Sequence, residues 1–333
     1  MEAVLTISLI TLVALLALLS HLGKKHWVAE VILVVALLLG SLLVLGLGVL
    51  LGAVLLLTAA TGTQGTDDPT VTPVIVAVVI SAGLAGLALC TPPLLKVLGR
   101  PPRRPFRLDP PIFFALWLFV LVLSANLLQL LSFEQIAALT LSSESRISPG
   151  LVLASQLPLV VVALAGVGLG LRRGPRETLT RLGYGPVTPL QLGLVALFIL
   201  GAFVVQFLAD SLFATLQPDL YERVGEVTDT LFNPEGLGAV AVVLFALLIG
   251  VGAATGEETL FRGAVQPVFG VVLTSILFAS VHIQYGPSVL LGYVFVLSLG
   301  LGLLRKHINT TASFLAHSGY NASSVLLVYF LGV

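Results

Sequence analysis

The stretch from Leu237 to Gly263, LGAVAVVLFALLIGVGAATGEETLFRG, joins a long apolar run to a compact group of charges. No charged residue precedes Glu257 in it, and about 20 apolar residues are enough to cross a bilayer as a helix. The run ends in Glu257, Glu258 and Arg262. An ionisable side chain inside a bilayer costs roughly 2.5–3.5 kcal/mol on insertion scales, so such groups are kept where they pair or perform chemistry. The stretch therefore predicts a membrane helix that carries a functional polar cluster.

The whole chain has the composition of a membrane protein. Of its 333 residues, 57% are hydrophobic and 10% are charged, and the mean hydropathy is +1.10. We predict an all-α polytopic membrane protein of about ten transmembrane helices, with a C-terminal helix bundle that encloses a polar cavity. The expected spans are 3–22, 28–60, 74–95, 112–132, 150–171, 190–216, 237–260, 264–285, 287–304 and 308–331.

The charge distribution limits the possible partners. The net charge is zero, and the basic residues lie in short loops between apolar spans rather than on one extended face. This pattern offers no basis for nucleic-acid binding and makes the lipid bilayer the expected surroundings. The sequence carries no signature of an oligomeric state.

Charged loops also predict how the chain crosses the membrane. A lysine pair at 24–25 precedes the span 28–60, and an aspartate pair at 67–68 follows it. Because basic loops favour the cytoplasmic side, this alternation favours one span at 28–60, although its glycines also allow a kink or a hairpin. The same alternation directs Glu257 toward the cytoplasmic side. Without an evident eukaryotic targeting motif, the expected location is a prokaryotic plasma membrane.

A proline-rich basic connector between Pro92 and Pro111 is the clearest break in the chain. We therefore expect three regions. Residues 1–111 form an N-terminal membrane region of unknown role together with the connector, residues 112–184 form intermediate helices, and residues 185–333 form the functional core.

Helical spacing predicts how the charges near the end of span 237–260 are arranged. Residues four apart share a helix face, so Arg262 stacks on Glu258 and can neutralise it. Glu257 points about 100° away and is left free to meet a partner. Desolvation of that free carboxylate favours its use as a general base.

Two histidines interrupt long apolar sequences downstream. His282 follows Phe278 by four residues, and His317 precedes Asn321 by four. An imidazole beside an amide can donate hydrogen bonds to an oxygen that gains negative charge during amide hydrolysis. Together with the carboxylates, these residues predict a proton-handling hydrolytic site.

The span at 264–285 needs an unusual course if His282 is to reach Glu257. A straight helix would hold His282 toward the opposite side of the membrane. Pro267 and the Gly286-Pro287 pair bound this segment. We therefore predict a short, steeply tilted or re-entrant segment, which is tolerated at depth where it lines a cavity.

Other polar side chains within the spans have structural interpretations. We expect interhelical hydrogen bonds from Asn126, Gln129, Gln156 and Gln206. Asp210 lies near the end of its span and is expected at the membrane interface.

Three motifs in sequence resemble those of the CPBP family, which includes Rce1-type CAAX-processing endopeptidases and bacteriocin-processing or self-immunity (Abi) relatives. They are EETLFRG at 257–263, FASVH at 278–282 and HSGYN at 317–321. The resemblance covers roughly 185–333. It implies an intramembrane endopeptidase of membrane-associated peptides or lipidated proteins, including prenylated CAAX-type substrates.

The resemblance also implies a role for each motif residue. Glu257, assisted by His282, would activate a water molecule. His317 and Asn321 would stabilise the oxyanion. Glu258, Arg262 and Phe278 would support these groups.

The sequence leaves three alternative functions open. Glu257, His282 and His317 could instead supply three zinc ligands with an open position for water, although the absence of a His-Glu-x-x-His segment favours a metal-free, glutamate-dependent site. A proton-coupled transporter also buries Glu and His, but spreads them through both halves of the chain. A non-enzymatic immunity scaffold would keep the motifs without turnover.

Overall fold

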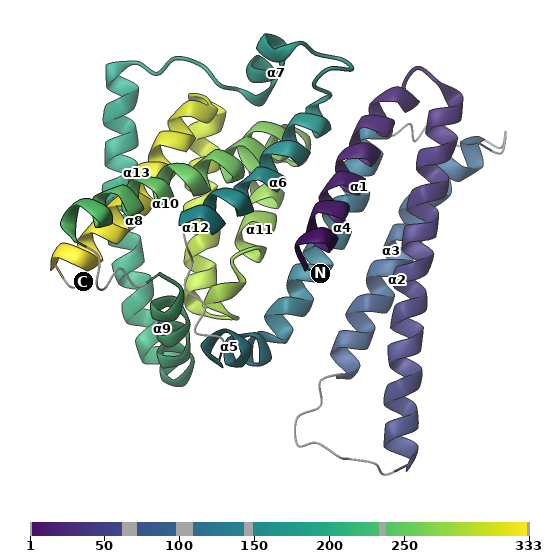
Figure 1. The fold of residues 1–333 in the computed structure, drawn as a ribbon, viewed down its shortest axis with the longest axis horizontal. Coiled ribbons are helices and arrows are strands. Elements are labelled where there is room, and N and C mark those ends of the chain that lie inside the picture. The colour runs from purple at the N-terminus through teal and green to yellow at the C-terminus, as the bar shows by residue number, and fades with distance from the viewer. Residues whose placement is uncertain (1, 62–71, 98–108, 143–148, 233–237, 332–333) are drawn as a thin grey trace. The chain divides into compact units, whose positions relative to one another are not determined.

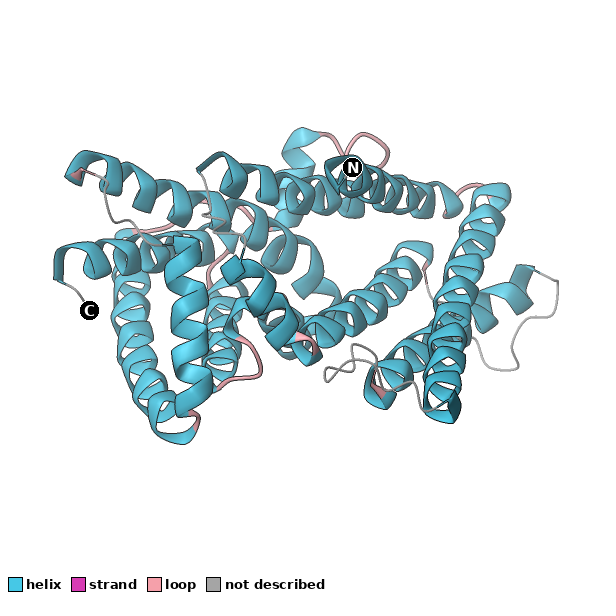
Figure 2. Cartoon of the chain, turned by 60° about the horizontal axis from the view of Figure 1, so that its bottom comes forward, coloured by secondary structure: helices cyan, strands magenta, loops and turns pink. Residues whose placement is uncertain are grey.

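The computed structural model describes residues 2–61, 72–97, 109–142, 149–232 and 238–331. Within these ranges the chain is helical and contains no strand, apart from an isolated bridge between Leu169 and Arg173 (Figures 1 and 2). Seven helical segments in the described ranges are long and apolar enough to cross a membrane: 6–23, 27–61, 73–95, 110–131, 189–216, 239–280 and 289–307. The predicted class, an all-α polytopic integral membrane protein, is confirmed.

Each of the expected spans contains a helix. In chain order these helices are α1 (Glu2–Gly23), α2 (Trp27–Thr61), α3 (Pro73–Val97), α4 (Pro110–Leu131), α6 (Pro149–Val167), α8 (Pro189–Leu216), α10 (Ala239–Glu257), α11 (Gln266–Ser280), α12 (Val289–His307) and α13 (Thr310–Leu331). Three shorter helices connect them: α5 (Phe133–Ser142), α7 (Pro175–Leu182) and α9 (Pro218–Phe232).

The structure corrects one boundary. The spans expected at 237–260 and 264–285 are not separated by a loop, because the π-helix η1 (Glu258–Val265) joins α10 directly to α11. The charges at 257–262, which suggested the end of a helix, instead lie within one helical segment from Ala239 to Ser280. π-Turns inside helices occur frequently at functional sites.

The chain divides into two compact units, one of residues 15–132 and one of residues 1–14 with 133–333. In the first unit α2 is a single continuous helix, as the charge alternation predicted, and no kink occurs at its glycines. Gly48 instead permits close approach to α3, since a Cβ atom there would lie 2.8 Å from Ile80 Cγ1. The aspartates at 67–68 and the basic residues at 100–107 lie outside the described residues.

The second unit contains all the candidate site residues. Within it α10 packs against α6 and α13, α11 against α12, and α8 against both α12 and α13. Small residues allow these close approaches. A Cβ atom at Gly250 of α10 would lie 2.5 Å from the Ser318 carbonyl oxygen of α13, and one at Gly256 would collide with Gln156 of α6. The packing therefore brings α6 and α13 against the end of α10 that carries Glu257.

The other intramembrane polar side chains behave in different ways. Gln206 makes the expected interhelical hydrogen bond, because its Oε1 accepts from the Tyr320 hydroxyl of α13 at a distance of 2.6 Å. Gln129 instead donates to Ala125 of its own helix, and Gln156 donates to the adjacent Ser155. Asp210 accepts from the Tyr221 hydroxyl of α9, and its charge is the main cause that raises the pKa of Tyr221.

Candidate functional site

Glu258 and Arg262 lie at the centre of the site, within η1. The carboxylate Oε2 is 3.4 Å from the guanidinium Nε, and both side chains are 0% exposed. The pair predicted from the four-residue spacing is therefore present, although its helix has π rather than α geometry. Removing two charges from water is costly, so each of these groups needs several partners.

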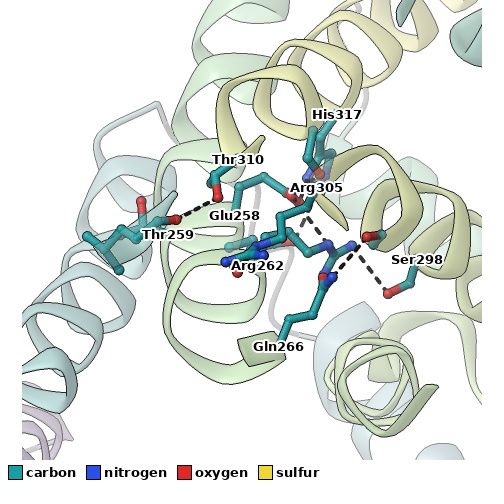
Figure 3. Close-up of polar contacts among 12 residues, drawn as sticks. Glu258, Thr259, Arg262, Gln266, Ser298, Arg305, Thr310 and His317 are labelled. Atoms are coloured by element: carbon teal, nitrogen blue, oxygen red, sulfur yellow. Dashed lines mark hydrogen bonds and ion pairs between the residues drawn. The ribbon is translucent and has the colours of Figure 1, made fainter. Parts of the chain in front are cut away.

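Glu258 gains two further partners from α13. His317 Nδ1 lies 2.9 Å from Glu258 Oε1, and the Ser313 hydroxyl donates to Oε2 at 2.5 Å. Figure 3 shows Glu258 between His317 and Arg262. Sequence reasoning paired His317 with Asn321 and missed both contacts. The four-residue spacing of Ser313 and His317, which places them on one face of a helix, was the available signal.

Phe278 packs beneath the charged groups. The Arg262 guanidinium carbon lies 4.5 Å from the centre of the Phe278 ring, within the range of a cation–π contact. The same ring lies 4.7 Å from the His282 ring and 5.9 Å from the His317 ring, between ring centres. Arg262 also donates to the Ser298 hydroxyl of α12 at 3.2 Å. Phe278 therefore contacts three of the other candidate residues.

Glu257 differs from Glu258 because it faces a cavity. Its side chain is 15% exposed, and Oε2 has no hydrogen-bond partner among the described residues. That oxygen lies 3.9 Å from His317 Nε2. Glu257 and His282 both line a cavity of about 390 Å³, together with side chains of α5, α6 and α9. Glu257 Oε2 is therefore free of hydrogen bonds among the described residues but lies within ion-pair range of His317.

A break in α11 accounts for the position of His282. Gly270 adopts φ 77° and ψ 178°, outside helical values, and this backbone conformation is accessible chiefly to glycine. The helix then ends before His282, whose φ of −90° and ψ of 55° lead into a short 3₁₀ turn at Ile283–Tyr285. The segment expected to be short or tilted is thus kinked at Gly270, and its end reaches the cavity that Glu257 lines.

The hydrogen bond of His282 determines its tautomer. Nδ1 lies 2.8 Å from the Phe278 carbonyl oxygen. A carbonyl can only accept, so Nδ1 carries the proton and Nε2 retains a free lone pair. The ring is also stacked parallel to Tyr285, with the ring planes 2° apart. His282 therefore presents a proton acceptor.

Asn321 lies one helical turn beyond His317 on α13 and is half-buried. Among the described residues, no hydrogen bond joins it to His317 or to the carboxylates. Its oxyanion role stays a prediction.

The three candidate zinc ligands are Glu257, His282 and His317, of which Glu257 Oε2 and His317 Nε2 lie 3.9 Å apart. Within the described part of the chain, no three His, Cys, Asp or Glu side chains are grouped closely enough to hold a metal ion. Nδ1 of His317 contacts Glu258 and Nδ1 of His282 contacts a carbonyl oxygen, so Nε2 is the ring nitrogen that each histidine has available for another partner. The choice between a metal-free and a zinc-dependent site stays a prediction.

These features define a class: a polytopic helical membrane protein with a buried carboxylate, imidazole and guanidinium cluster beside a cavity that Glu257 and His282 line. Residues 239–323 match the family described as type II CAAX prenyl endopeptidase Rce1-like. The matched range contains all three motifs, so the resemblance drawn from them is confirmed for residues 239–323. No curated protein and no solved structure matches the chain.

Proposed function

We propose that this protein is an intramembrane endopeptidase that hydrolyses peptide bonds of membrane-associated substrates by glutamate-activated water. The observation that carries this proposal is that Glu257, whose Oε2 accepts no hydrogen bond among the described residues, and His282, whose Nδ1 is held by a carbonyl, line the same cavity. Both groups are proton acceptors at a site bordered by apolar helices. A water molecule there has two bases within the same small volume.

In the proposed mechanism, Glu257 takes a proton from water as the water oxygen attacks the scissile carbonyl carbon. His282 orients that water through Nε2. The tetrahedral intermediate then collapses with cleavage of the C–N bond, and the proton held by Glu257 passes to the leaving amine. The products are a carboxylic acid and an amine, which become a carboxylate and an ammonium when the acid's proton passes to the amine, and the base returns to its starting state.

His317 and Asn321 are the proposed oxyanion donors. Glu258 accepts from Nδ1 of His317, and its negative charge stabilises a positively charged ring. Such a ring carries a proton on Nε2, the atom on the Glu257 side, and can donate it to the developing oxyanion. Asn321 would add a second donor from the next turn of α13. Arg262 balances the charge of Glu258, so that the carboxylate keeps its position during turnover.

A neighbouring groove supports a substrate with an apolar chain, of which a prenylated CAAX-type peptide is the example. This groove has a volume of about 670 Å³ and lies between α6 and α10, lined almost entirely by aliphatic side chains. Gln156 lines both the groove and the polar cavity. In the proposal, the apolar chain lies in the groove and the peptide enters the cavity past Gln156, whose buried Oε1 has no partner among the described residues.

The test is cleavage of a fluorogenic peptide panel, prenylated and unmodified, by detergent-purified wild type and Glu257→Gln, each with and without chelator. Turnover by wild type alone, unaffected by chelator, is the expected result. Loss with chelator and recovery with zinc would replace the glutamate mechanism with a zinc-dependent one. Equal turnover by both proteins would refute the assigned base, and no turnover by folded wild type would favour a non-enzymatic scaffold.

A further inference from the structure

Pro267 removes one backbone donor from the end of the wide turn. In η1 the amide of Gln266 donates to Phe261, five residues earlier. If the five-residue spacing continued, the amide of residue 267 would donate to the Arg262 carbonyl. If the helix returned to α-helical four-residue spacing, the same amide would donate to the Gly263 carbonyl. Proline has no N–H, so neither bond can form. Carbonyl groups removed from water need another donor.

Two arginines from other helices donate to the two carbonyl groups that a donor at residue 267 could reach. Arg305 of α12 donates from Nε to the Arg262 carbonyl oxygen at 3.0 Å, and Arg181 of α7 donates from Nη1 to the Gly263 carbonyl oxygen at 3.2 Å. Figure 3 shows Arg305 beside Arg262. Both are charge-assisted bonds, which are stronger than bonds between neutral groups. Burial lowers the pKa of Arg181, with smaller contributions from Arg173 and Arg305, but a guanidinium remains protonated at neutral pH.

Close packing of α7 on the turn makes the Arg181 contact possible. A Cβ atom at Gly263 would lie 2.8 Å from Leu182 Cδ2 and 3.2 Å from the Leu182 carbonyl oxygen, so a side chain there would displace α7. Tyr184, just beyond α7, bonds Thr259 of the turn at 2.7 Å between hydroxyl oxygens. The end of α7 and the residues just after it are thus fixed to the turn at Gly263 and Thr259, four residues apart.

The same segment also holds α13, which carries His317. The Thr310 hydroxyl donates to the Leu182 carbonyl at 2.6 Å, and the Thr310 amide donates to the Gly183 carbonyl at 2.9 Å. Gly183 has a φ of 81°, and a Cβ atom there would lie 2.8 Å from the Thr310 hydroxyl. The end of α7 therefore connects the turn that begins at Glu258, directly after Glu257, to the helix that carries His317.

We propose that Arg181 is a positioning residue, which holds the wide turn, and with it Glu257 and Glu258, by replacing the hydrogen-bond donor that Pro267 lacks. Arg181 lies outside the residues that match the Rce1-like family. The kinetic consequences of this inference rest on the proposed endopeptidase activity. Its structural consequences do not.

The test is a double-mutant cycle between Arg181→Ala and Pro267→Ala, with a farnesylated fluorogenic CAAX peptide as the probe. Pro267→Ala restores a backbone N–H beneath the two carbonyls. We expect Arg181→Ala to lower kcat about tenfold with a smaller change in KM, the size of effect that loss of one charge-assisted bond produces. In the Pro267→Ala background the same change should cost less than about twofold.

Matched variants separate positioning from a general charge effect. Arg176 lies on the same helix and is exposed, so Arg176→Ala should leave kcat unchanged. Arg181→Gln keeps one amide donor without the charge and takes the place of Arg181→Ala in the cycle if that variant does not fold. Equal losses of kcat in both Pro267 backgrounds would overturn the proposal, as would an Arg181 variant with wild-type kcat.

Hydrogen exchange keeps this inference separate from the proposed function. Amides 257–266 should exchange faster in Arg181→Ala than in wild type or Arg176→Ala, and Pro267→Ala should reverse the change. If wild type cleaves no peptide, the proposed function fails while this exchange pattern still decides the inference. If wild type is active and exchange is unchanged in Arg181→Ala, the inference alone fails.

Discussion

His317 donates from Nδ1 to Oε1 of Glu258 across 2.9 Å, although 59 positions separate the two residues in the chain. The contact joins η1 to α13 at a point where both side chains are buried. It also orients the imidazole, because Nε2 is then directed to the side of Glu257. The two adjacent glutamates therefore have different tasks. Glu258 holds the ring, and Glu257 is left for the cavity.

Glu257→Gln is expected to abolish peptide cleavage and leave the fold intact. The amide matches the carboxylate in volume but cannot accept a proton, and a positioned general base contributes about 10²–10⁴ in rate. Single-turnover cleavage of the fluorogenic peptide measures the loss. An unchanged thermal unfolding temperature in detergent is the required control, since Glu257 makes no hydrogen bond from Oε2 among the described residues. Residual activity near the wild-type rate would remove Glu257 from the mechanism.

Glu258→Gln is expected to destabilise the protein as well as inactivate it. The change leaves the Arg262 guanidinium buried beside a neutral partner, and breaking a buried ion pair from one side costs about 3–5 kcal/mol. Thermal unfolding in detergent should show the difference from Glu257→Gln directly. The double variant Glu258→Gln with Arg262→Met should recover part of the lost stability. If the two single glutamate variants unfold at the same temperature, the assignment of separate tasks is wrong.

Substitution of the two proposed oxyanion donors is expected to lower turnover with little effect on substrate binding. His317→Ala and Asn321→Ala should each reduce kcat by roughly 10²–10³, the range found when one oxyanion donor is removed. His317→Ala should also reduce stability, because Glu258 loses a partner, whereas Asn321→Ala should not. Steady-state kinetics and unfolding measured on the same preparations test both statements. A normal kcat in Asn321→Ala would leave His317 as the sole donor.

Local sequence features predicted the parts of this molecule that depend on neighbouring residues. Apolar run lengths located the membrane helices, because spanning a bilayer depends on length and hydropathy. The Glu258 and Arg262 contact followed from their spacing and persists in a π-turn, since the two residues remain about one turn apart. The free orientation of Glu257 came from the same reasoning.

Contacts between distant segments could not be obtained in this way. The bond between His317 and Glu258 depends on how closely α13 approaches α10, which small residues such as Gly250 allow. The charges at 257–262 suggested a helix end, because charged residues are usually exposed. They are buried here because α12 and α13 supply their partners, which local spacing does not reveal. The contribution of Arg181 depends on the packing of α7 against Gly263. Local spacing placed Ser313 and His317 on one helix face, but it could not show which residues of another helix that face would meet.

Val251→Trp is expected to discriminate against substrates with a long apolar chain. Val251 lines the groove between α6 and α10, and its side chain is 46% exposed, so a larger ring there can occupy part of the volume. We expect KM for a farnesylated peptide to rise about tenfold or more, since a buried CH₂ group contributes about 0.8 kcal/mol and several would be displaced. KM for the unmodified peptide should stay within about twofold.

Val243→Trp is the matched control, because Val243 lies on the same helix and is exposed but does not line the groove. Equal rises in KM for the two peptides, or equal effects of the two tryptophan variants, would show that the groove does not hold the apolar chain.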